Sequence, residues 1–400
     1  MKEGWEYKKL DDICSSIEDG DWIESKDQSP NGIRLIQTGN IGNGSYKDKK
    51  DNAKYISEET FKRLHCTEIF EGDILVSRLP DPVGRACTLP DLGCRCITAV
   101  DCSILKIKKD LVCNAWITYF MQSQAYFTII NSQCTGSTRL RITRKKLAEI
   151  LIPVPPLSEQ QSIVDYLDSA FAKIDAMKAN AEKALGEAKA LFQASLKEML
   201  EPKEGWEEKK MKEVVISITD GDHQPPPKSD DGIPFITISN IDKNSNKIVF
   251  GETFYVPQSY YCALKKDRIP QQGDVLYTVT GSFGIPVLID FQKDFCFQRH
   301  IALIRPKMGV LSPTYLFYWI LSSYATSQAE NTATGAAQRT VSLNSLRNFT
   351  IHIPTFSTQQ SIVATLDSLK SKVDRLQENY DKISQECDAL KQAILRQVFE

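Results

Sequence analysis

The segment KEGWEYKKL (residues 2–10) returns half a chain length later as KEGWEEKKM (residues 203–211). A period of this size is far longer than the ~20 to 50 residues of solenoid repeats. Each copy is therefore expected to be a whole domain with its own core and its own appendage, rather than one unit of a stacked array.

The two halves stay in step beyond this first segment. IEDGD (residues 17–21) corresponds to ITDGD (residues 218–222). The closing segments, residues 135–168 and 334–367, agree best and share an identical Ser-x-Gln-Gln-Ser-Ile-Val core. The sequence thus predicts an internal repeat that runs through the whole chain.

Composition sets the broad class. The chain has 400 residues with 42% hydrophobic content, enough for two or three domains. No stretch approaches the ~18 apolar residues of a membrane span, and the first residues are too polar for a signal peptide, so a cytoplasmic protein is expected. The formal net charge of −2 gives no bulk indication of a nucleic-acid partner.

The cysteines argue against a shared disulfide framework. Eight of the eleven fall in the first 134 residues, whereas the matching stretch of the second half holds Cys262 and Cys296. Cys94, Cys96 and Cys102 offer no second CxxC or HxxxH pair, as a zinc site would need. Structural or free thiols are expected, and no metal site.

Two kinds of sequence pattern predict the strands and the helices of the globular parts. Short β-branched runs predict strands, and aromatic and apolar residues at helical spacing predict helices. The predicted strands are residues 74–77, 103–107, 274–279 and 300–306, and the predicted helices are residues 115–130 and 313–328. The globular parts are therefore expected to be α+β.

Each mixed region ends at a proline-punctuated strand, IPVPPL (residues 152–157) or IHIPTF (residues 351–356). Ser158 and Ser357 follow as predicted helix N-caps. No glycine or proline interrupts residues 357–400. A long helix is expected in both copies, about 60 Å at ~1.5 Å per residue.

Both long helices show heptad spacing, which predicts a coiled coil. The seam of the second helix contains Ile362, Leu366, Leu369, Val373, Leu376, Tyr380, Ile383, Cys387, Leu390 and Ile394. The seam of the first contains Ile163, Leu167, Ala170, Ile174, Met177, Ala181, Ala184, Ala188, Leu191 and Ser195. Small residues facing bulky ones favour antiparallel pairing of the two helices within one chain, with a pseudo-twofold axis. Self-association of identical helices, or a simple dimerisation stalk, remains the alternative.

Catalytic motifs are absent from the sequence. There is no G-x-x-x-x-G-K-[ST], no G-x-S-x-G and no H-E-x-x-H, and none of the four histidines aligns with another across the repeat. Asp73 and Asp274 do recur, inside Gly-Asp dipeptides before a strand, where a turn residue is more common than a general base. No catalytic residue is predicted.

One basic run, from Arg139 to Lys146, interleaves arginine and lysine with Ser137, Thr138 and Thr143. A run of this kind is usually a solvated face. Its alternative role is contact with phosphate, which requires the cations to gather on one surface.

Several of these segments together resemble the specificity subunit of type I restriction-modification systems. They are EGWE, the GDIL strand, the TGS and TGA segments, and above all IPVPPLSEQQSIVDYLD with its weaker copy IHIPTFSTQQSIVATLD. The resemblance covers essentially the whole chain. It implies two globular α/β target recognition domains separated by two long helices that form an antiparallel intramolecular coiled coil.

The resemblance also implies domain bounds and partners. Residues 1–157 and 202–356 would each read one half of a bipartite, asymmetric double-stranded DNA target. Helices 158–201 and 357–400 would set the unread spacer and dock the modification subunits. The chain would be a non-catalytic adaptor that binds no cofactor. Two modification subunits would bring S-adenosylmethionine and adenine-N6 methylation, and restriction subunits would bring ATP- and magnesium-dependent translocation and cleavage.

The second copy departs from the family pattern at two positions. Thr355 replaces the second proline, and Thr358 replaces the glutamate. A weaker capping contact is expected at that helix start, which allows the two modification-subunit contacts to be unequal.

Candidate DNA contacts follow the glycine that aligns between the repeats, where the side chains diverge. Arginine can bind guanine and glutamine can bind adenine through paired hydrogen bonds in the major groove. The first candidates are Thr138, Arg139, Arg141, Gln338, Arg339 and Thr340. The second group comprises Gln37, Thr38, Asn40, Arg78, Arg85, Thr237, Ser239, Asn240, Thr278 and Thr280, some of which are expected to satisfy backbone groups instead.

Two other function classes are weighed against the DNA-reading adaptor. A self-contained DNA-modifying enzyme would need a cofactor-binding glycine motif or a carboxylate cluster, and would show activity as an isolated chain. A homodimeric coiled-coil scaffold would appear as a stable dimer in light scattering.

Overall fold

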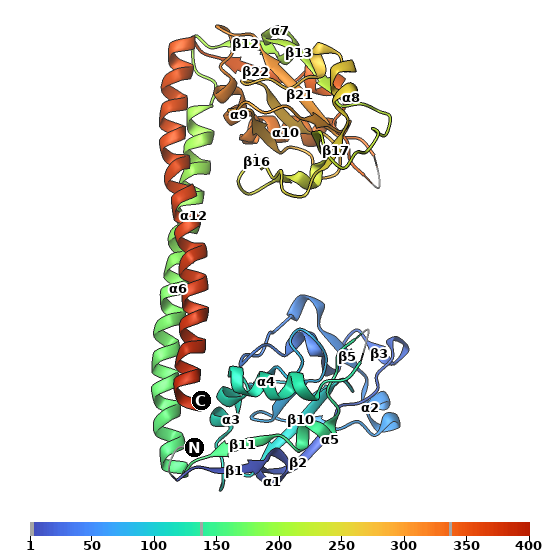
Figure 1. The fold of residues 1–400 in the computed structure, drawn as a ribbon, viewed down its shortest axis with the longest axis vertical. Helices are drawn as coiled ribbons and strands as arrows, with labels where there is room; N and C mark the ends of the chain where they lie inside the picture. Colours follow the sequence, from blue (N-terminus) through green and yellow to red (C-terminus); the bar gives the residue numbers. More distant parts are fainter. Residues whose placement is uncertain (1–3, 137–138, 336–337) are drawn as a thin grey trace. The chain divides into compact units, whose positions relative to one another are not determined.

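The computed structural model describes residues 4–136, 139–335 and 338–400. It divides into two compact units, here called unit 1 (Met1–Asn180 with Lys382–Glu400) and unit 2 (Ala181–Asp381). Each unit contains one copy of the repeat and a part of each long helix (Figure 1). This division falls inside both helices, so the domain bounds set from sequence stay predictions.

Three sheets form the frame of unit 1. The four-stranded antiparallel sheet has the order β2 (Cys14–Asp19), β10 (Cys102–Ile107), β7 (Ile74–Ser77), β8 (Ala86–Thr88). A five-stranded sheet has the order β3 (Gln28–Ser29), β5 (Lys54–Ile56), β4 (Ile33–Ile36), β9 (Cys96–Thr98), β6 (Glu68–Ile69), with β4 and β9 parallel. The third sheet pairs β1 (Glu6–Lys9) with β11 (Leu151–Val154).

Unit 2 repeats this order of strands. Its four-stranded sheet is β13 (Val215–Asp220), β21 (Ile301–Pro306), β18 (Val275–Thr278), β19 (Pro286–Leu288). A three-stranded sheet is β17 (Phe254–Val256), β14 (Ile233–Ile236), β20 (Cys296–Phe297), and β12 (Glu207–Lys210) pairs with β22 (Thr350–Ile353). A short hairpin, β15 (Ile241–Asp242) with β16 (Lys247–Ile248), completes the set.

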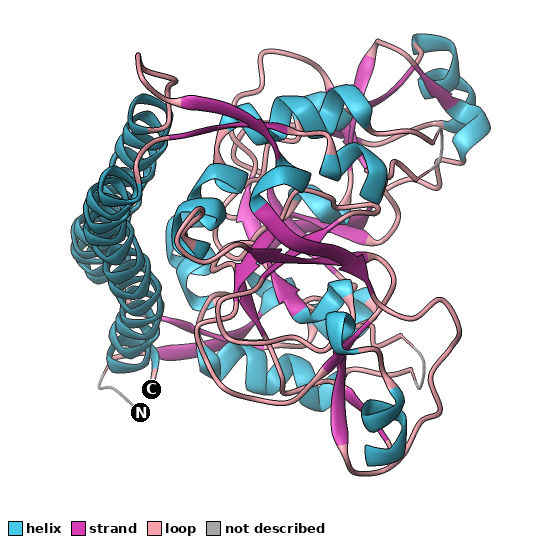
Figure 2. Ribbon diagram, turned by 90° about the horizontal axis from the view of Figure 1, so that it is seen from above, coloured by secondary structure: helices cyan, strands magenta, loops and turns pink. Residues whose placement is uncertain are grey.

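The short helices also correspond between the units in their order along the chain. Figure 2 shows helices, strands and long loops interspersed in the globular parts. In unit 1 they are α1 (Leu10–Ile13), α2 (Glu58–Leu64), α3 (Asn114–Phe120), α4 (Gln124–Gln133) and α5 (Arg144–Ala148). In unit 2 they are α7 (Met211–Val214), α8 (Gln258–Ala263), α9 (Pro313–Leu321), α10 (Ser323–Thr332) and α11 (Leu343–Arg347).

The predicted strands are confirmed as β7, β10, β18 and β21. The two predicted helices are wrong in one respect, because each is a pair of helices. Ser123 and Ser322 interrupt them, and their buried hydroxyl groups donate to the carbonyl oxygens of Phe120 (2.7 Å) and Trp319 (2.6 Å). Ser123 also accepts from the Tyr126 backbone N–H, so the next helix begins there as an N-capped element.

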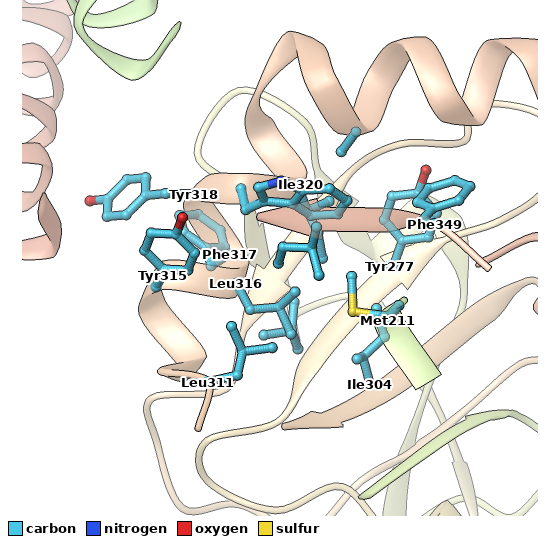
Figure 3. Close-up of a cluster of buried hydrophobic side chains, with 14 of the residues drawn as sticks. Met211, Tyr277, Ile304, Leu311, Tyr315, Leu316, Phe317, Tyr318, Ile320 and Phe349 are labelled. Atoms are coloured by element: carbon cyan, nitrogen blue, oxygen red, sulfur yellow. The ribbon is translucent and has the colours of Figure 1, made fainter. Parts of the chain in front are cut away.

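The core of unit 2 lies between α9 and the four-stranded sheet. Figure 3 shows Tyr315, Leu316 and Ile320 of α9 gathered with Tyr277 of β18 and Ile304 of β21. All of them are at most 2% exposed. Burial of each such side chain is worth roughly 1.5 to 3 kcal/mol, so α9 is fixed on the sheet mainly by its apolar face.

The two long helices are α6 (Leu157–Met199) and α12 (Phe356–Phe399). They begin before Ser158 and Ser357, so the predicted N-caps are wrong by register. The expected weakening of the cap in the second copy is also wrong. Thr355 Oγ1 accepts from the Thr358 backbone N–H at 3.3 Å and lies 2.9 Å from the Thr358 hydroxyl. The two threonines that depart from the family pattern thus cap α12 themselves.

Within each unit, α6 and α12 pack together. In unit 1, Lys391 Nζ donates to Asp175 at 2.6 Å, and Lys178 lies 3.4 Å from Asp388. The numbers rise on α6 as they fall on α12, so the pairing is antiparallel. In unit 2, Lys189 donates to Gln377 at 2.8 Å. The intrachain pairing predicted from the seams is confirmed.

Burial corrects part of the predicted seam. Leu167, Ile174 and Leu366 are at most 5% exposed. A further group is half-buried, namely Ile163, Ile362, Leu369, Val373, Leu376, Ile383 and Ile394. Met177, Leu191 and Leu390 are 59, 60 and 49% exposed, and their assignment to the seam is wrong.

Heptad spacing leaves open whether the next inward residue after Leu167 lies three or four positions later, at Ala170 or at Phe171. Steps of three and of four residues both fit a heptad, and only packing chooses between them. Phe171, Leu185 and Phe192 of α6, each one residue after a predicted one, are buried. Phe171 packs edge-on against Tyr119 of α3, and Phe192 packs against Tyr318 of α9, so the globular parts contribute to the burial of these two rings.

The structure also bears on membrane-spanning helices and on cysteine pairing. In the described part of the chain, no helix is long and apolar enough to cross a membrane. All eleven cysteines are free thiols, and the sulfurs of Cys94 and Cys96 lie 4.0 Å apart.

Candidate nucleic-acid interface

In unit 1, five loops meet at one edge of the four-stranded sheet. Because neighbouring strands are antiparallel, β2 and β7 end where β10 begins. The Arg78 backbone N–H after β7 donates to the Asp101 carbonyl before β10 at 2.9 Å. The Ala99 N–H donates to the Ile36 carbonyl at 2.9 Å, which brings the loop after β4 to the same edge. We call this the polar edge, formed by residues 19–24, 37–40, 78–85, 99–101, 135–136 and 139–142.

Unit 2 builds the equivalent polar edge from residues 220–223, 237–240, 278–285, 298–300, 334–335 and 338–341. The Val279 N–H donates to the His300 carbonyl at 2.9 Å, and the Gln298 N–H donates to the Ile236 carbonyl at 3.0 Å. Backbone bonds thus place the same loops together in both units.

A tight hairpin at each polar edge carries the first candidates. Thr135 and Arg141 exchange two backbone bonds of 2.9 Å, and Thr334 and Thr340 exchange bonds of 3.0 and 2.8 Å. The glycine that follows each threonine, Gly136 or Gly335, has a positive φ of 116° or 108°. A Cβ there would lie 2.3 or 2.5 Å from a backbone oxygen, so only glycine allows this turn.

The hairpin tips present different side chains on the same frame. Arg139 and Arg141 are exposed in unit 1. In unit 2, Gln338 and Arg339 are exposed and Thr340 is half-buried. Arg339 donates to the Glu330 carbonyl at 2.7 Å and lies over the Phe283 ring at 5.4 Å. Thr138 lies outside the described residues.

Arg85 has a structural role, and its contact with DNA stays a prediction. It is 8% exposed and donates to the carbonyl oxygens of Ile41, Leu79, Pro82 and Thr38 at 2.8 to 2.9 Å. Four of its five N–H groups are therefore used to hold its own loop, residues 78–85, to the loop after β4.

Two asparagines and two threonines of the second group are also structural. Asn40 and Asn240 accept from the backbone N–H groups of Gln37 (3.0 Å) and Thr237 (2.9 Å). Thr278 donates to the Ser282 carbonyl at 2.8 Å and accepts from the Ile285 N–H at 3.0 Å. Thr280 is 6% exposed and meets the Thr340 hydroxyl at 3.4 Å. These four side chains thus satisfy groups of the fold, as expected for part of the second group, and their contact with DNA stays a prediction.

Of the remaining second-group candidates, all but Arg78 are exposed or half-buried at the polar edges. Gln37 and Ser239 are exposed, and Thr38 and Thr237 are half-buried. Arg78 is 5% exposed, and one of its terminal nitrogens donates to the Val100 carbonyl. The structure thus brings Gln37, Arg78 and the hairpin arginines to one edge, although they are up to about a hundred residues apart in sequence.

Sequence reasoning missed an aspartate that recurs at each edge. Asp19 accepts from Ser103 Oγ at 3.2 Å and lies 3.5 Å from Arg78 and 3.8 Å from Arg144. Its counterpart Asp220 lies 3.0 Å from His223 and 3.6 Å from Arg268. The repeated IEDGD and ITDGD segments carried the signal, but they gave no indication of the partners.

An aromatic residue was missed as well. Trp22, which follows the repeated Gly-Asp of unit 1, is 69% exposed, and His223 occupies the same place in unit 2. His300 lies at the same edge of unit 2, and partial burial, then Arg299, lowers its pKa below the usual 6.5.

The repeated glutamine motif has a positional role that the sequence did not show. Gln160 is fully buried, accepts from the Cys113 N–H at 3.0 Å and donates to the carbonyl oxygens of Leu111 (3.1 Å) and Pro155 (2.8 Å). Gln359 makes the equivalent bonds to Ser312, Val310 and Pro354, at 2.8, 2.8 and 3.1 Å. This glutamine clamp fixes the start of each long helix to the globular part that it follows.

A second link lies two turns further along each helix. Tyr119 of α3 donates to Asp168, and Tyr318 of α9 donates to Asp367 at 2.6 Å. Burial, then the hydrogen bond to Asp168, raises the pKa of Tyr119. Both links hold the helices by buried or half-buried polar bonds rather than by apolar contact alone.

The described residues contain no group of three or more histidine, cysteine, aspartate or glutamate side chains that could hold a metal ion. What the polar edges offer is a set of hydrogen-bond donors on rigid loops. Such an arrangement suits recognition of an extended polar partner.

A comparison with protein families finds one match in both halves of the chain. The model described as "Type I restriction modification DNA specificity domain" matches residues 2–185 and 203–385.

Curated relatives are similar at low identity. The EcoKI specificity subunit of Escherichia coli K12 is 25% identical over 399 residues, covering 92% of this chain and 82% of that subunit. The putative MjaX specificity subunit of Methanocaldococcus jannaschii is 23% identical, with 92% and 87% covered. The EcoBI specificity subunit of Escherichia coli is 23% identical, and the match spans 60% of this chain and 56% of the relative.

Solved structures share the fold. A chain from a study of complex assembly and conformational transition of the type I R-M system aligns with a TM-score of 0.73 at 18% identity, covering 100% of this chain and 98% of that one. The HsdS subunit of Thermoanaerobacter tengcongensis aligns with a TM-score of 0.53 at 20% identity, covering 100% and 97%.

Proposed function

Since this chain belongs to the type I restriction modification DNA specificity domain family, we propose that it is the DNA-specificity subunit of a type I restriction-modification enzyme. Each unit reads one half of a bipartite, asymmetric target in double-stranded DNA. Catalysis belongs to other subunits, in line with the non-catalytic role of specificity subunits.

The observation that carries the proposal is the pair of equivalent hairpins with different tips. Arg139 to Arg141 read Arg-Leu-Arg, and Gln338 to Thr340 read Gln-Arg-Thr, on backbones held by the same bonds. A common frame with divergent donors and acceptors is what two half-sites of different sequence require. Arginine suits guanine, and glutamine suits adenine.

The long helices support a role as spacer and platform. α6 and α12 have 43 and 44 residues and pair antiparallel within each unit. At ~1.5 Å per residue each is about 65 Å long. We propose that they set the unread length between the two half-sites and dock two modification subunits.

The partner activities are part of the same proposal. Modification subunits carry S-adenosylmethionine and methylate adenine at N6, and restriction subunits use ATP and magnesium to translocate and cleave DNA. This chain contributes recognition and binds none of these cofactors.

The test is a methylome. The full chain is expressed with the adenine methyltransferase encoded beside it in a methylation-free host, and modified bases are mapped by single-molecule sequencing. A split motif with one methylated adenine in each half is expected. Exchange of the tip residues of one hairpin for those of the other should change one half of the motif only.

Two results would contradict the proposal. One is a stable complex with no new methylation, which would favour a scaffold. The other is methylation by this chain alone, which would favour a self-contained enzyme.

A further inference from the structure

A hollow in unit 1 lies between the end of β7, the end of β2 and the start of α5. It is lined by Asp19 at the end of β2, by Arg78 directly after β7, and by Arg144 and Lys145 at the start of α5. It adjoins the hairpin, because the Ile142 N–H donates to the Arg78 carbonyl at 3.4 Å.

Arg78 is the incompletely satisfied residue of this hollow. It is 5% exposed, and its Nε has no hydrogen-bond partner in the described part of the chain. One terminal nitrogen donates to the Val100 carbonyl, and the Asp19 carboxylate is 3.5 Å away. A buried N–H without an acceptor costs about 1 to 3 kcal/mol, so this site is suited to an acceptor from outside the chain.

The charges around Arg78 favour an anion. Arg144 is half-exposed and lies 3.8 Å from Asp19, at the limit of an ion pair, and Lys145 is exposed. Three cations thus face two carboxylates, those of Asp11 and Asp19, in the lining of one hollow. A phosphodiester, with one charge and several acceptor oxygens, matches both the excess cation and the spare donor.

We propose that this hollow anchors a phosphate of the DNA backbone in unit 1. The inference rests on the proposed function and separates two roles at one edge. The hairpin tip contacts base edges, and the hollow fixes the register of the duplex through its backbone.

Unit 2 carries different residues at the matching positions. Val279 stands in the place of Arg78, and Leu343 and Asn344 stand in the places of Arg144 and Lys145. Arg347 of α11 is engaged in the fold, since it donates to the Ile218 carbonyl at 2.7 Å. Unit 1 is therefore expected to supply more of the sequence-independent affinity than unit 2.

The experiment measures how DNA affinity depends on salt. The full chain, assembled with its methyltransferase, is titrated with duplex containing the mapped motif and with unrelated duplex between about 50 and 200 mM salt. Affinity falls as salt rises, and loss of one phosphate contact reduces the magnitude of this negative slope, log affinity against log salt, by about 0.9. Arg144→Gln with Lys145→Asn should lower it by this amount on both duplexes and leave the methylated motif unchanged.

Matched variants make the result specific. Lys109→Asn removes one charge from an exposed position after β10, at the opposite end of that strand from the polar edge, and should leave the slope unchanged. Asn344→Lys adds a lysine at the equivalent place in unit 2 and should make the dependence of affinity on salt steeper. Equal thermal unfolding of all variants excludes misfolding as the cause.

The outcomes separate this inference from the function on which it rests. If the unaltered complex does not distinguish its motif from unrelated duplex, the proposed function fails and the anchor fails with it. If it binds specifically but Arg144→Gln with Lys145→Asn keeps the full slope, the anchor alone is overturned. Weaker assembly with the methyltransferase at an unchanged slope would also overturn it, because the hollow would then bind protein.

Discussion

Units 1 and 2 surround the same aspartate with different cations. In unit 1, Asp19 lies near Arg78 and Arg144, whereas in unit 2 Asp220 lies near His223 and Arg268. The partners come from different loops in the two units. An aspartate at the end of an edge strand is thus compatible with many sources of positive charge, which leaves the charge pattern of each edge free to differ.

The glutamine clamp shows the opposite behaviour. Gln160 and Gln359 make the same three bonds to equivalent backbone groups and are fully buried. Substitution there would leave several buried backbone groups without partners, which is costly. The contrast shows that fully buried hydrogen bonds to the backbone are the same in both repeats, whereas the charged partners at the polar edges differ.

The largest effect is expected at this clamp. Gln160→Ala and Gln359→Ala should each destabilise the chain by about 3 to 4 kcal/mol, since both leave a buried N–H and two buried carbonyl groups unpaired. Urea unfolding, followed by tryptophan fluorescence, measures this loss. Gln161→Ala, at the exposed neighbouring position, should cost less than about 0.5 kcal/mol. Markedly different costs for the two clamp glutamines would break the equivalence of the units.

The next largest effects are expected at the turn aspartates, where the free-energy cost of substitution should differ between the two units. Asp73 and Asp274 accept the same turn bond, from Phe70 and Gln271 at 2.9 Å, as the Gly-Asp pattern predicted. Asp274 also pairs with the largely buried Arg305 at 2.7 Å. Asp274→Asn should therefore cost about 3 kcal/mol by leaving the Arg305 charge unpaired.

Asp73→Asn is the matched change in unit 1, where Lys106 takes the place of Arg305. It should cost about 1 kcal/mol, the value of an ordinary hydrogen bond. Chemical denaturation of both variants gives the comparison, and equal costs would show that the Arg305 pair adds nothing.

A smaller effect is expected at the hairpin tip. Arg141→Thr, which installs the residue of Thr340, should lower discrimination in one half-site by about 1 to 3 kcal/mol, or about 5- to 150-fold. Methylation rates on duplexes altered in one half-site at a time measure this. Unchanged rates on all of them would remove Arg141 from the base contacts, and Lys109→Thr, at an exposed position after β10, serves as the charge control.

The smallest effect is a pH dependence confined to unit 2. Because its folded-state pKa lies below 6.5, His300 contributes stability that is present above pH 6.5 and is lost as pH falls through the folded pKa. Unit 1 has Asp101 at the equivalent place. Thermal unfolding between about pH 7.5 and 5 should decline less for His300→Asn than for the unaltered chain. An NMR titration midpoint above 6.5 for His300 would contradict this sign.

Local pattern was sufficient for much of the fold. The strands at β7 and β10, the proline-terminated strands β11 and β22, and the existence of two long helices follow from short-range composition and periodicity. The helix breaks at Ser123 and Ser322 did not, because a buried serine that closes a helix looks in sequence like any other polar residue within one.

The candidate interface was predictable only in part. The divergent positions after Gly136 and Gly335 marked the hairpins, since a repeated glycine with changing neighbours indicates a fixed backbone with variable side chains. The pattern could not show that Arg85 donates hydrogen bonds to four backbone carbonyl oxygens. Nor could it show that Arg78, which follows β7, lies beside α5. Accessibility and long-range proximity have no periodic signature.

By itself, the sequence determined that the chain is a duplication of an α+β domain followed by a long helix, because a repeat and a heptad are written in local order. The tertiary structure decided that Phe171, rather than Ala170, is the buried residue that follows Leu167 on α6. It also decided which arginines stay exposed at the polar edge. Those outcomes depend on buried contacts between residues far apart in the chain. Such contacts are selected by packing and hydrogen-bond satisfaction rather than by any neighbouring residue.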